Sequence, residues 1–407
     1  MQEFFIQLTY FIINNITDGD IYIGIFMKII IFGGDGFCGW PTALKLSKHG
    51  HEICIVDNLS RREIDKKLGI QSLTPIKDID ERIVVASKMF NPISFINIDI
   101  MNDHDSLEKL IYDFKPKTII QFAEQRSAPY SMTSDSERRY TVNNNVSGTH
   151  NICNSIVKID KTIHLVHLGT MGVYGYTKEF GSIPEGYLDI IVKSTEKNSS
   201  ILYPANPGSI YHMTKCLDQL IFQFYNKNWG LKITDLHQGI VWGIDTDETK
   251  LDKSLNNRFD YDGIYGTVLN RFISQAAQGV PLTIYGTGGQ TRAFIHINDT
   301  AQCVKLAVEN YNFDSSKVRI FNQVAETKKI SELAEIISKK YGSKISYIEN
   351  PRKELSENEL EVSNKGLKSL GFKPILLNEA LVEDVHKIAE IFKESFDLNK
   401  VLNSPKW

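Results

Sequence analysis

A glycine-spaced turn near the start of the chain is the feature that most constrains its fold. The β-branched run Lys28–Phe32 is typical of a strand that is buried on both faces. Gly33, Gly36 and Gly39 follow it at intervals of three, and a helical pattern begins directly after them. Such glycines permit a tight turn and let the N–H groups of a helix N-terminus approach a pyrophosphate. The sequence therefore predicts a parallel sheet whose first turn binds a dinucleotide.

An acidic residue at the end of the next apolar run extends this prediction. The run Glu52–Val56 ends in Asp57 and Asn58, about 20 residues after the turn, where dinucleotide-binding folds place an acid. A carboxylate there accepts hydrogen bonds from the ribose hydroxyls and repels a 2′-phosphate, so we expect NAD rather than NADP. Arg61 and Arg62 leave three interpretations open: a grip on a 2′-phosphate, stacking on adenine, or solvation.

Apolar runs and helical patterns alternate through the first part of the chain. The further apolar runs are 94–98, 118–122, 164–168 and 233–236, and helical patterns at 106–114, 146–157 and 211–229 separate most of them. This alternation predicts an α/β fold, a Rossmann-type doubly wound parallel sheet with helices on both faces. After residue 243 the chain becomes polar and acid-rich before apolar segments return. We therefore assign residues 27–242 to an NAD-binding domain and 243–407 to a smaller mixed α/β substrate domain, some of whose strands return to the first.

Composition excludes several classes of function. The 46 basic and 49 acidic residues give a net charge of −3 with no long block of one sign, which argues against a nucleic-acid or membrane surface. Residues 1–26 form an N-terminal extension without a basic start or a cleavage site, and we expect the native chain to begin at Met27. No apolar run of about 20 residues predicts a membrane span. The five scattered cysteines indicate a cytoplasmic location, and neither a disulfide framework nor a metal site.

A tyrosine and a lysine four positions apart form the candidate catalytic pair. Tyr211 and Lys215 share one face of the predicted helix, so Lys215 is expected to lower the tyrosine pKa and to hold the cofactor ribose. The phenolate can then act as a base near neutral pH. Thr170 follows the run 164–168 at the carboxyl end of a strand, where its hydroxyl can bond to the sugar hydroxyl being oxidised. Because Tyr-x-x-x-Lys occurs by chance in many helices, only the combination is informative.

The order of glycine turn, acid, strand-end threonine and Tyr-x-x-x-Lys resembles the extended short-chain dehydrogenase/reductase family over about residues 27–407. This resemblance implies NAD bound to the first domain and a nucleotide-sugar bound to the second. The implied catalytic residues are Thr170, Tyr211, Lys215 and His212. The implied cofactor-binding residues are Gly33, Asp35, Gly36, Phe37, Cys38, Gly39, Asp57, Asn58, Arg61, Arg62, Asp99, Ile100, Asn144 and Lys215. The implied substrate-binding residues are Arg126, Thr170, Gln238, Arg271, Gln290, Arg292 and Arg352.

Arginines late in the chain fit a nucleotide diphosphate. Arg292 ends a segment, 286–292, that resembles the family's nucleotide-phosphate segment, and Arg352 resembles its late arginine. Both side chains can pair bidentately with a pyrophosphate, and Arg271 is a third candidate. Each of them taken singly is more often a surface residue.

The residues after Thr170 narrow the reaction. Typical 4,6-dehydratases of the family carry an acid and a base there, whereas this chain has Met171 and Gly172, neither of which moves a proton. A UDP-hexose 4-epimerase needs no such pair and stays open. Longer segments, among them 33–40, 54–62, 124–132, 168–172, 257–262 and 288–292, resemble the UDP-sulfoquinovose synthases of the same family. Val173 departs from that resemblance, because the plant-type members carry Glu there.

The synthase resemblance implies that UDP-glucose and sulfite are joined to give UDP-sulfoquinovose and water, with NAD recycled through a 4-keto intermediate. Arg126 is the candidate to hold sulfite, and His212 the candidate to move protons at C5 or C6. A histidine beside a catalytic tyrosine can also point away, so both assignments stay open. The implied partner is a second copy in a homodimer, and whether sulfite arrives free or from a sulfite-donating protein stays open. A non-catalytic NAD-binding scaffold is the remaining alternative, although such proteins commonly lose the Tyr or the Lys.

Overall fold

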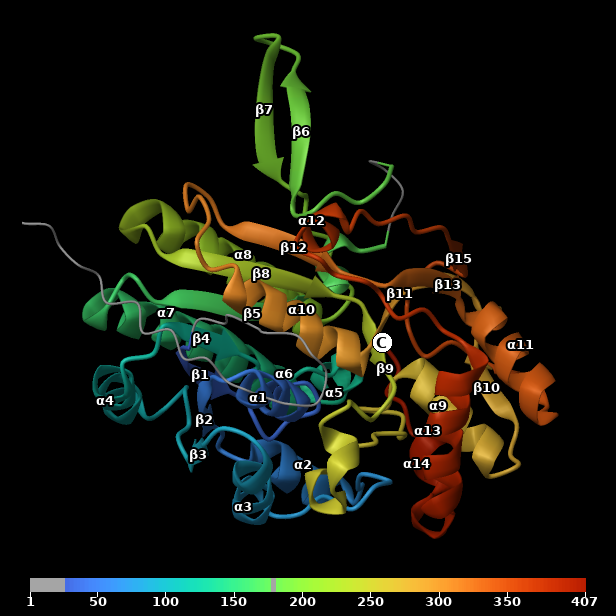
Figure 1. Ribbon diagram of the computed structural model, residues 1–407. Coiled ribbons are helices and arrows are strands. Elements are labelled where there is room, and N and C mark those ends of the chain that lie inside the picture. Colours follow the sequence, from blue (N-terminus) through green and yellow to red (C-terminus); the bar gives the residue numbers. More distant parts are fainter. Residues whose placement is uncertain (1–25, 177–180) are drawn as a thin grey trace, which may run out of the picture.

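A seven-stranded sheet in the order β12-β8-β5-β4-β1-β2-β3 forms the centre of the protein (Figure 1). The computed structural model describes residues 26–176 and 181–407, so nearly all of the extension expected at residues 1–26 lies outside the described residues. The strands of this sheet run parallel and confirm the predicted doubly wound α/β fold. They are Lys28–Phe32 (β1), Glu52–Val56 (β2), Ile93–Ile96 (β3), Thr118–Gln121 (β4), His164–Thr170 (β5), Lys232–Gln238 (β8) and Arg319–Gln323 (β12).

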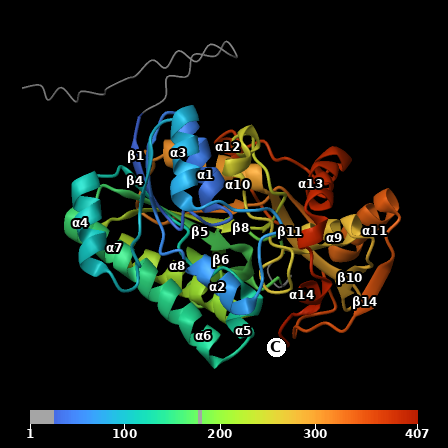
Figure 2. The same cartoon turned by 90° about the horizontal axis from the view of Figure 1, so that it is seen from below.

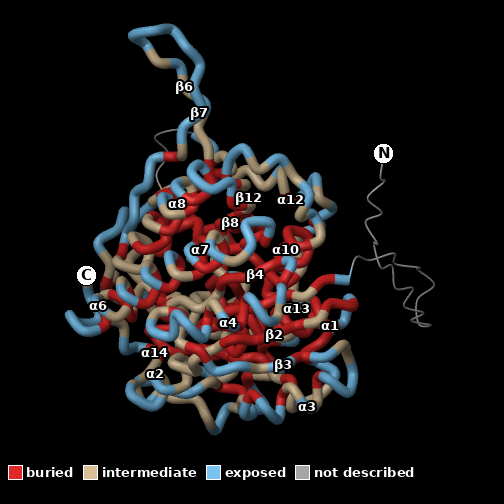
Figure 3. The backbone as a smooth tube through the Cα atoms, turned by 90° about the vertical axis from the view of Figure 1, so that its left-hand side faces the viewer, coloured by how far each residue is buried: buried red, intermediate tan, exposed pale blue. Residues whose placement is uncertain are grey.

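Helices cover both faces of the sheet (Figure 2). One face carries α1 (Gly39–Lys48), α3 (Ile79–Met89) and α10 (Ile297–Glu309), and the other carries α4 (His104–Phe114), α7 (Gly148–Ile159) and α8 (Ile210–Trp229). The first strand shows why its sequence is continuously apolar. Ile29 and Ile31 pack into one core, and Ile30 and Phe32 into the other, so every residue of the run meets a buried layer. The buried tube in Figure 3 follows these central strands.

A smaller lobe lies beside this sheet in Figure 1. It contains a four-stranded sheet of Ile240–Trp242 (β9), Gly289–His296 (β11), Glu326–Lys329 (β13) and Glu357–Asn358 (β15), and the pair Leu282–Tyr285 (β10) and Ile345–Ile348 (β14). Its core is enclosed by α9 (Val268–Ala277), α11 (Ile330–Tyr341), α13 (Glu379–Ile391) and α14 (Leu398–Leu402). From the same half of the chain, β12 pairs with β8 in the large sheet. The domain boundary at residues 242/243 stays a prediction.

Short helices connect these layers. They are Ser60–Leu68 (α2), Ala128–Met132 (α5), Asp135–Val142 (α6) and Lys365–Ser369 (α12). A π-helical turn, Asn143–Ser147, joins α6 to α7 where the sequence predicted an ordinary helix start at residue 146. Such a widened turn shifts the side chains that follow it and is frequent at functional sites. Among the described residues, no helix is both long enough and apolar enough to cross a bilayer.

A two-stranded hairpin extends away from the body of the protein (Figure 1). Its strands, Tyr187–Val192 (β6) and Lys197–Leu202 (β7), pair antiparallel. The sequence patterns did not indicate it, because its apolar residues are interleaved with charged and hydroxyl side chains and bury little surface. Ile191 is 69% exposed. At the root of the hairpin, the backbone N–H of Gly186 donates to the Tyr174 hydroxyl over 3.1 Å.

Candidate active site

A cavity of about 930 Å³ lies at the carboxyl ends of the large sheet, between this sheet and the smaller lobe. Ligands of open α/β sheets bind at this edge. Most of the predicted site residues line it: Gly33, Gly36, Phe37, Cys38, Gly39, Asp57, Asn58, Arg61, Ile100, Arg126, Asn144, Thr170, Tyr211, His212, Lys215, Gln238, Arg271, Gln290, Arg292 and Arg352. The structure thus brings together residues that are far apart in the sequence.

The glycine turn between β1 and α1 has no room for side chains. Gly33 has a φ of +78°, and a Cβ there would lie 2.6 Å from the backbone nitrogen of Ala123. Its carbonyl oxygen also occupies the place where a Cβ of Gly39 would stand. Gly36 faces the cavity, so a phosphate can approach the backbone of the turn there. This cradle fits a dinucleotide.

Asp57 directly follows β2 at the cavity wall and is held there by backbone N–H groups. Its Oδ2 accepts from Asp35 over 3.1 Å, and its Oδ1 accepts from Leu59 over 2.8 Å. Burial, together with the negative charge of Asp35, raises the pKa of Asp57 to about 6. The carboxyl group is therefore ionised at neutral pH and fits the ribose hydroxyls of a dinucleotide.

Asp35, Arg62 and Asp99 are the predicted cofactor-binding residues that do not line the cavity. Asp35 and Arg62 bind each other, with the Arg62 Nε donating to Asp35 over 2.6 Å, and Arg82 adds a second ion pair to Asp35 at 2.7 Å. Asp99 accepts a hydrogen bond from the Met101 N–H and so closes the turn before α4. The Arg62 guanidinium is thus already paired within the fold and does not line the cavity.

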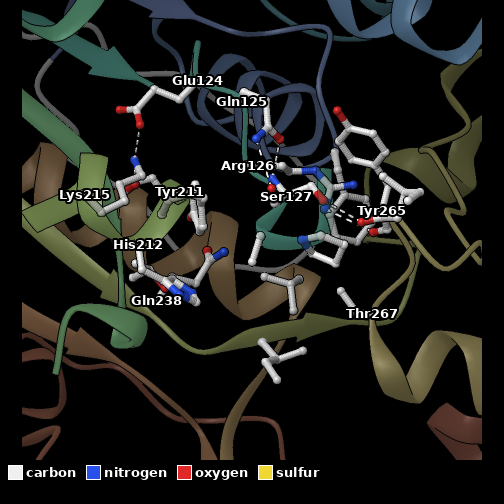
Figure 4. Close-up of a pocket in the computed structure, with 18 of the residues that line it drawn as sticks. Glu124, Gln125, Arg126, Ser127, Tyr211, His212, Lys215, Gln238, Tyr265 and Thr267 are labelled. Carbon is white, nitrogen blue, oxygen red and sulfur yellow. Dashed lines mark hydrogen bonds and ion pairs between the residues drawn. The ribbon is translucent and has the colours of Figure 1, made fainter. Parts of the chain in front are cut away.

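Tyr211 and Lys215 lie in α8 and face the cavity beside Glu124, which follows β4 (Figure 4). The Lys215 Nζ forms an ion pair with the Glu124 carboxylate at 2.8 Å and donates to the Leu168 carbonyl over 2.7 Å. Burial raises the pKa of Tyr211 to about 12, while Lys215 lowers it and Glu124 raises it. The expected influence of Lys215 thus has the predicted sign, but burial outweighs it in the protein without ligands.

His212 occupies the space that a side chain at position 172 would need. A Cβ on Gly172 would overlap the His212 ring, so the imidazole stands next to the end of β5 and lines the cavity. Its Nδ1 is 3.1 Å from the Ser209 hydroxyl. Burial, with the positive charges of Arg352 and Arg292, lowers the pKa of His212 to about 4. The ring is therefore neutral at pH 7 and able to accept a proton.

Three arginines converge on one aspartate where α2 meets the loop after β9, and we name this group the Asp260 cluster. The Oδ1 of Asp260 accepts from Arg61 over 3.2 Å and from Arg258 over 3.1 Å, and its Oδ2 pairs with Arg126 at 2.5 Å. Asp65 pairs with Arg61 and, at 2.6 Å, with Arg258. Three cations and two anions leave the Asp260 cluster with one excess positive charge.

A second group of arginines lies in the smaller lobe, and we name it the Tyr285 cluster. Arg271 donates to the Tyr285 hydroxyl over 3.1 Å, and Arg292 pairs with Glu354 at 2.5 Å. The Nε atoms of Arg271 and Arg352 are buried without a hydrogen-bond partner among the described residues. Orphaned donors on buried cations are costly unless an anion satisfies them. The Tyr285 cluster therefore fits a phosphate or diphosphate group.

Sequence reasoning missed several residues that line the cavity. Glu124 stands at the carboxyl end of β4 in the same segment as Arg126, and this strand-end position was the signal that could have found it. Tyr265 and Tyr285 lie in loops or edges whose position only the tertiary structure gives. Trp407 reaches the cavity from the last residue of the sequence and donates to the Gly208 carbonyl over 3.2 Å. No local pattern indicates these three aromatic residues.

Relatives of the chain were found along nearly its whole length. It is 41% identical over 385 residues to the chloroplastic UDP-sulfoquinovose synthase of Spinacia oleracea, which covers 93% of this chain and 79% of that protein. It is 40% identical over 367 residues to the UDP-sulfoquinovose synthase of Sulfolobus acidocaldarius, which covers 88% of this chain and 91% of that protein.

Solved structures confirm the fold. A UDP-glucose 4-epimerase from Thermotoga maritima, solved with UDP-glucose, superposes with a TM-score of 0.65 at 20% identity and covers 91% of this chain and 100% of its own. A UDP-glucuronic acid 4-epimerase from Bacillus cereus, solved with UDP-glucuronic acid and NAD, gives a TM-score of 0.65 at 19% identity with the same coverage. At these identities the likeness concerns the fold alone.

A family model brings the sequence motifs and the fold together. The model described as the NAD dependent epimerase/dehydratase family matches residues 29–322, which include the glycine turn, the Tyr211–Lys215 pair and all seven strands of the large sheet up to Asn322. With this match, and with 40–41% identity to two synthases over most of its length, the chain belongs to the NAD-dependent epimerase/dehydratase family and, within it, to the UDP-sulfoquinovose synthases.

Proposed function

We propose that the protein is an NAD-dependent enzyme that joins UDP-glucose and sulfite to give UDP-sulfoquinovose and water. The structural observation that carries the proposal is the His212 imidazole beside Gly172. A plain 4-epimerase needs no further proton-transfer group near C5 and C6, whereas loss of water from the sugar does. The neutral imidazole supplies such a group where the chain lacks the acid and base of ordinary dehydratases.

Oxidation at C4 of the sugar opens the proposed sequence. Tyr211 takes the proton of the C4 hydroxyl, and the Thr170 hydroxyl at the end of β5 orients the same oxygen. NAD held by the glycine turn and Asp57 would supply both the acceptor for the C4 hydride and its later donor, so that no net oxidation results. The ammonium of Lys215 stabilises the phenolate of Tyr211.

Proton removal at C5 follows, because a ketone at C4 acidifies the C5–H bond. His212 takes this proton and passes it to the C6 hydroxyl, which leaves as water and gives an enone. Sulfite enters in its singly protonated form, its sulfur lone pair adds at C6 to form the C–S bond, and its proton passes to C5. Reduction of C4, with Tyr211 returning its proton, releases the sulfosugar nucleotide.

The two arginine clusters divide the anionic groups of the substrates between them in this proposal. The Tyr285 cluster, with its orphaned Nε donors, would bind the diphosphate of UDP-glucose. Arg126 of the Asp260 cluster, which lies near Tyr211 on the cavity wall, would bind sulfite. Sulfite would then compete with Asp260 for the Arg126 guanidinium.

We also propose that the protein forms a homodimer through α8. Leu220 and Phe224 lie four positions apart on this helix and are 58% and 55% exposed, and Trp229 near its end is 38% exposed. An apolar row of this kind on a long surface helix is typical of a helix-to-helix contact between copies.

The five cysteines are buried and unpaired, which supports a reducing compartment such as the cytoplasm.

Incubation of the purified protein with UDP-glucose and free sulfite, followed by mass spectrometry of the nucleotide-sugar, tests the reaction. A sulfite-dependent UDP-sulfohexose supports the proposal and shows that a sulfite-donating protein is not required. UDP-galactose formed without sulfite would instead establish a UDP-hexose 4-epimerase. Tyr211→Phe is the control, because a catalyst loses turnover in this variant while it still binds NAD; a scaffold binds NAD and turns over nothing in either form.

His212→Gln separates the C4 step from the C5 step. In deuterated water the unaltered protein is expected to place deuterium at C5 of UDP-glucose. The variant is expected to lose this exchange by roughly 100-fold, within the usual range for loss of a general base, while NAD is still reduced by the sugar. Undiminished exchange in the variant would contradict the assigned role of His212.

A further inference from the structure

Behind the catalytic lysine, ionisable side chains cross three neighbouring strands in one row. Glu124 follows β4, His167 lies in β5 and Asp235 in β8, and these strands are adjacent in the sheet. The His167 Nε2 lies 2.9 Å from the Glu124 Oε1, and its Nδ1 lies 2.8 Å from the Asp235 Oδ1. Lys215 meets the other oxygen of Glu124 at 2.8 Å. All four side chains are almost fully buried, with at most 4% exposed.

The absence of a side chain at Gly169 leaves room for this row of ionisable groups. A Cβ on Gly169 would lie 2.5 Å from the Asp235 Oδ1 and 2.8 Å from the His237 ring. The row continues from Asp235 to the His237 Nε2 at 2.9 Å, and from the His237 Nδ1 to the Tyr174 hydroxyl at 2.6 Å. The contacts are thus a continuous network rather than an isolated ion pair.

Charges alternate along the row. Burial and the charge of Lys215 lower the pKa of His167, but the carboxylates of Asp235 and Glu124 raise it to about 9. The imidazole is therefore protonated at neutral pH. Burial raises the pKa of Asp235 and of Glu124, but their cationic neighbours bring both below the usual value. Burial and the charge of Glu124 hold the pKa of Asp218 well above its usual range, so this nearby carboxyl stays neutral.

The alternation decides how strongly the lysine acts on the tyrosine. The Lys215 ammonium donates to the Leu168 carbonyl and lies 2.8 Å from the Glu124 Oε2 and 3.0 Å from the His167 Nε2. Alone, the Glu124 carboxylate would cancel the charge of Lys215 in a medium of low polarity. The His167 imidazolium pairs with the Glu124 Oε1 and neutralises the carboxylate, and its Nε2 also lies 3.0 Å from the Lys215 Nζ.

We propose that Glu124, His167 and Asp235 are positioning residues that form a buried charge array: Glu124 fixes Lys215, and the imidazolium of His167, held by Asp235, neutralises Glu124 so that the charge of Lys215 acts on Tyr211. The inference rests on the proposed role of Tyr211 as the base. The groups that face Tyr211 are Lys215, Glu124, Arg126, Tyr176 and the neighbouring His212 ring. Of these, Glu124 belongs to the array, and Lys215 contacts both Glu124 and His167.

The array predicts that its variants shift the pKa of Tyr211 in opposite directions. Glu124→Gln removes the anion beside Lys215, and the ionisation of Tyr211 is expected to move about one pH unit toward acid. His167→Gln leaves Glu124 without its cation, and the ionisation is expected to move at least about one pH unit toward alkali. Asp235→Asn removes the group that keeps His167 charged and is expected to act in the same direction as His167→Gln, which provides a second variant if the first does not fold.

The measurement is phenolate absorbance of the protein without substrate, taken as the difference between each variant and the same variant carrying Tyr211→Phe. The acid limb of the turnover profile against pH is a second readout. His164→Gln is the matched control, because His164 is buried in the same strand and its pKa is lowered to about 3 by burial and nearby cations, so it carries no charge. It is expected to leave both readouts unchanged.

Opposite shifts for Glu124→Gln and for either His167→Gln or Asp235→Asn support the array. Shifts in one direction for all variants, or none beyond the control, would overturn it and assign these residues a structural role only. Because the absorbance titration needs neither UDP-glucose nor sulfite, failure of the array is distinguishable from failure of the proposed reaction.

Discussion

The two arginine clusters of the cavity use the same side chain in opposite ways. In the Asp260 cluster, each of the three guanidiniums already pairs with Asp260, and two of them also pair with Asp65. In the Tyr285 cluster, Glu354 pairs with Arg292, and neither Arg271 nor Arg352 pairs with a carboxylate among the described residues. The second cluster is thus prepared for a strongly charged anion, whereas the first must give up an internal partner before it binds one.

Two tyrosines report this difference. The pKa of Tyr285 lies below its usual value. Burial raises this pKa, but the effects of Arg271, the Ser404 hydroxyl and Arg352 outweigh burial. Burial holds the pKa of Tyr265 well above its usual range, even though Arg61 stacks on its ring at 3.6 Å. The lesson is that the number of nearby arginines does not set the local potential; the carboxylates that share them do.

The largest effect is expected for the Tyr285 cluster, in which Glu354 is the one carboxylate paired with an arginine among the described residues. Arg352→Ala should weaken UDP-glucose binding by roughly 100-fold, about 3 kcal/mol, because a charge-assisted contact to the diphosphate is lost. Titration calorimetry with UDP-glucose and, separately, with NAD measures this, and NAD binding should not change. Arg139→Ala, in an exposed ion pair on α6, is the matched control. Equal binding by Arg352→Ala and the control would show that the Tyr285 cluster does not bind the diphosphate.

A smaller effect is expected in the partnered cluster. Arg126→Gln should raise the KM for sulfite about tenfold and leave the KM for UDP-glucose unchanged. The effect is smaller than for Arg352 because Asp260 already neutralises part of the Arg126 charge. Initial rates at varied sulfite and saturating UDP-glucose measure it. A raised KM for UDP-glucose instead would move Arg126 into the nucleotide site.

Removal of the Asp260 carboxylate should make the Asp260 cluster behave more like the Tyr285 cluster. Asp260→Asn frees Arg126, so the KM for sulfite should fall a few-fold, while the free energy of unfolding should drop by about 3 kcal/mol because the buried Arg258 loses a partner. Arg258, Arg61 and Arg126 hold the pKa of Asp260 far below its usual value against burial, so the carboxylate is charged at every working pH. Urea unfolding measures the stability change. A higher sulfite KM would show that Asp260 orients Arg126 rather than competing for it.

The smallest expected effect is spectroscopic. UDP placed beside Tyr285 adds negative charge, which disfavours the phenolate, so the pKa of Tyr285 should rise by about one unit. Absorbance titration with and without UDP, referred to Tyr285→Phe, detects the shift. Tyr265→Phe should leave the UDP-dependent shift in the absorbance titration unchanged. If UDP binds elsewhere, Tyr285→Phe will leave it unchanged as well.

Features that depend on local spacing could be read from the sequence. The glycine turn, the strand ends at Asp57 and Thr170, and the Tyr211–Lys215 face all depend on short-range geometry that the structure reproduces. Arg62 shows the limit, because nothing local indicates that Asp35 takes its guanidinium. The same reason hid Glu354 and Asp260, which are paired across long stretches of chain. Sequence patterns identify the charged groups, but the partners that set their availability come only from the tertiary structure.

The hairpin β6–β7 offers a practical site for labelling. Its turn, residues 193–196, is fully on the surface and lies at the tip of an extension that adds no strand to either sheet (Figure 1). Exposed tips of this kind tolerate insertions well. A fluorophore or a small folded tag inserted there would lie away from the residues that line the cavity, and its signal would come from an arm rooted at Tyr174, whose hydroxyl belongs to the network behind Lys215.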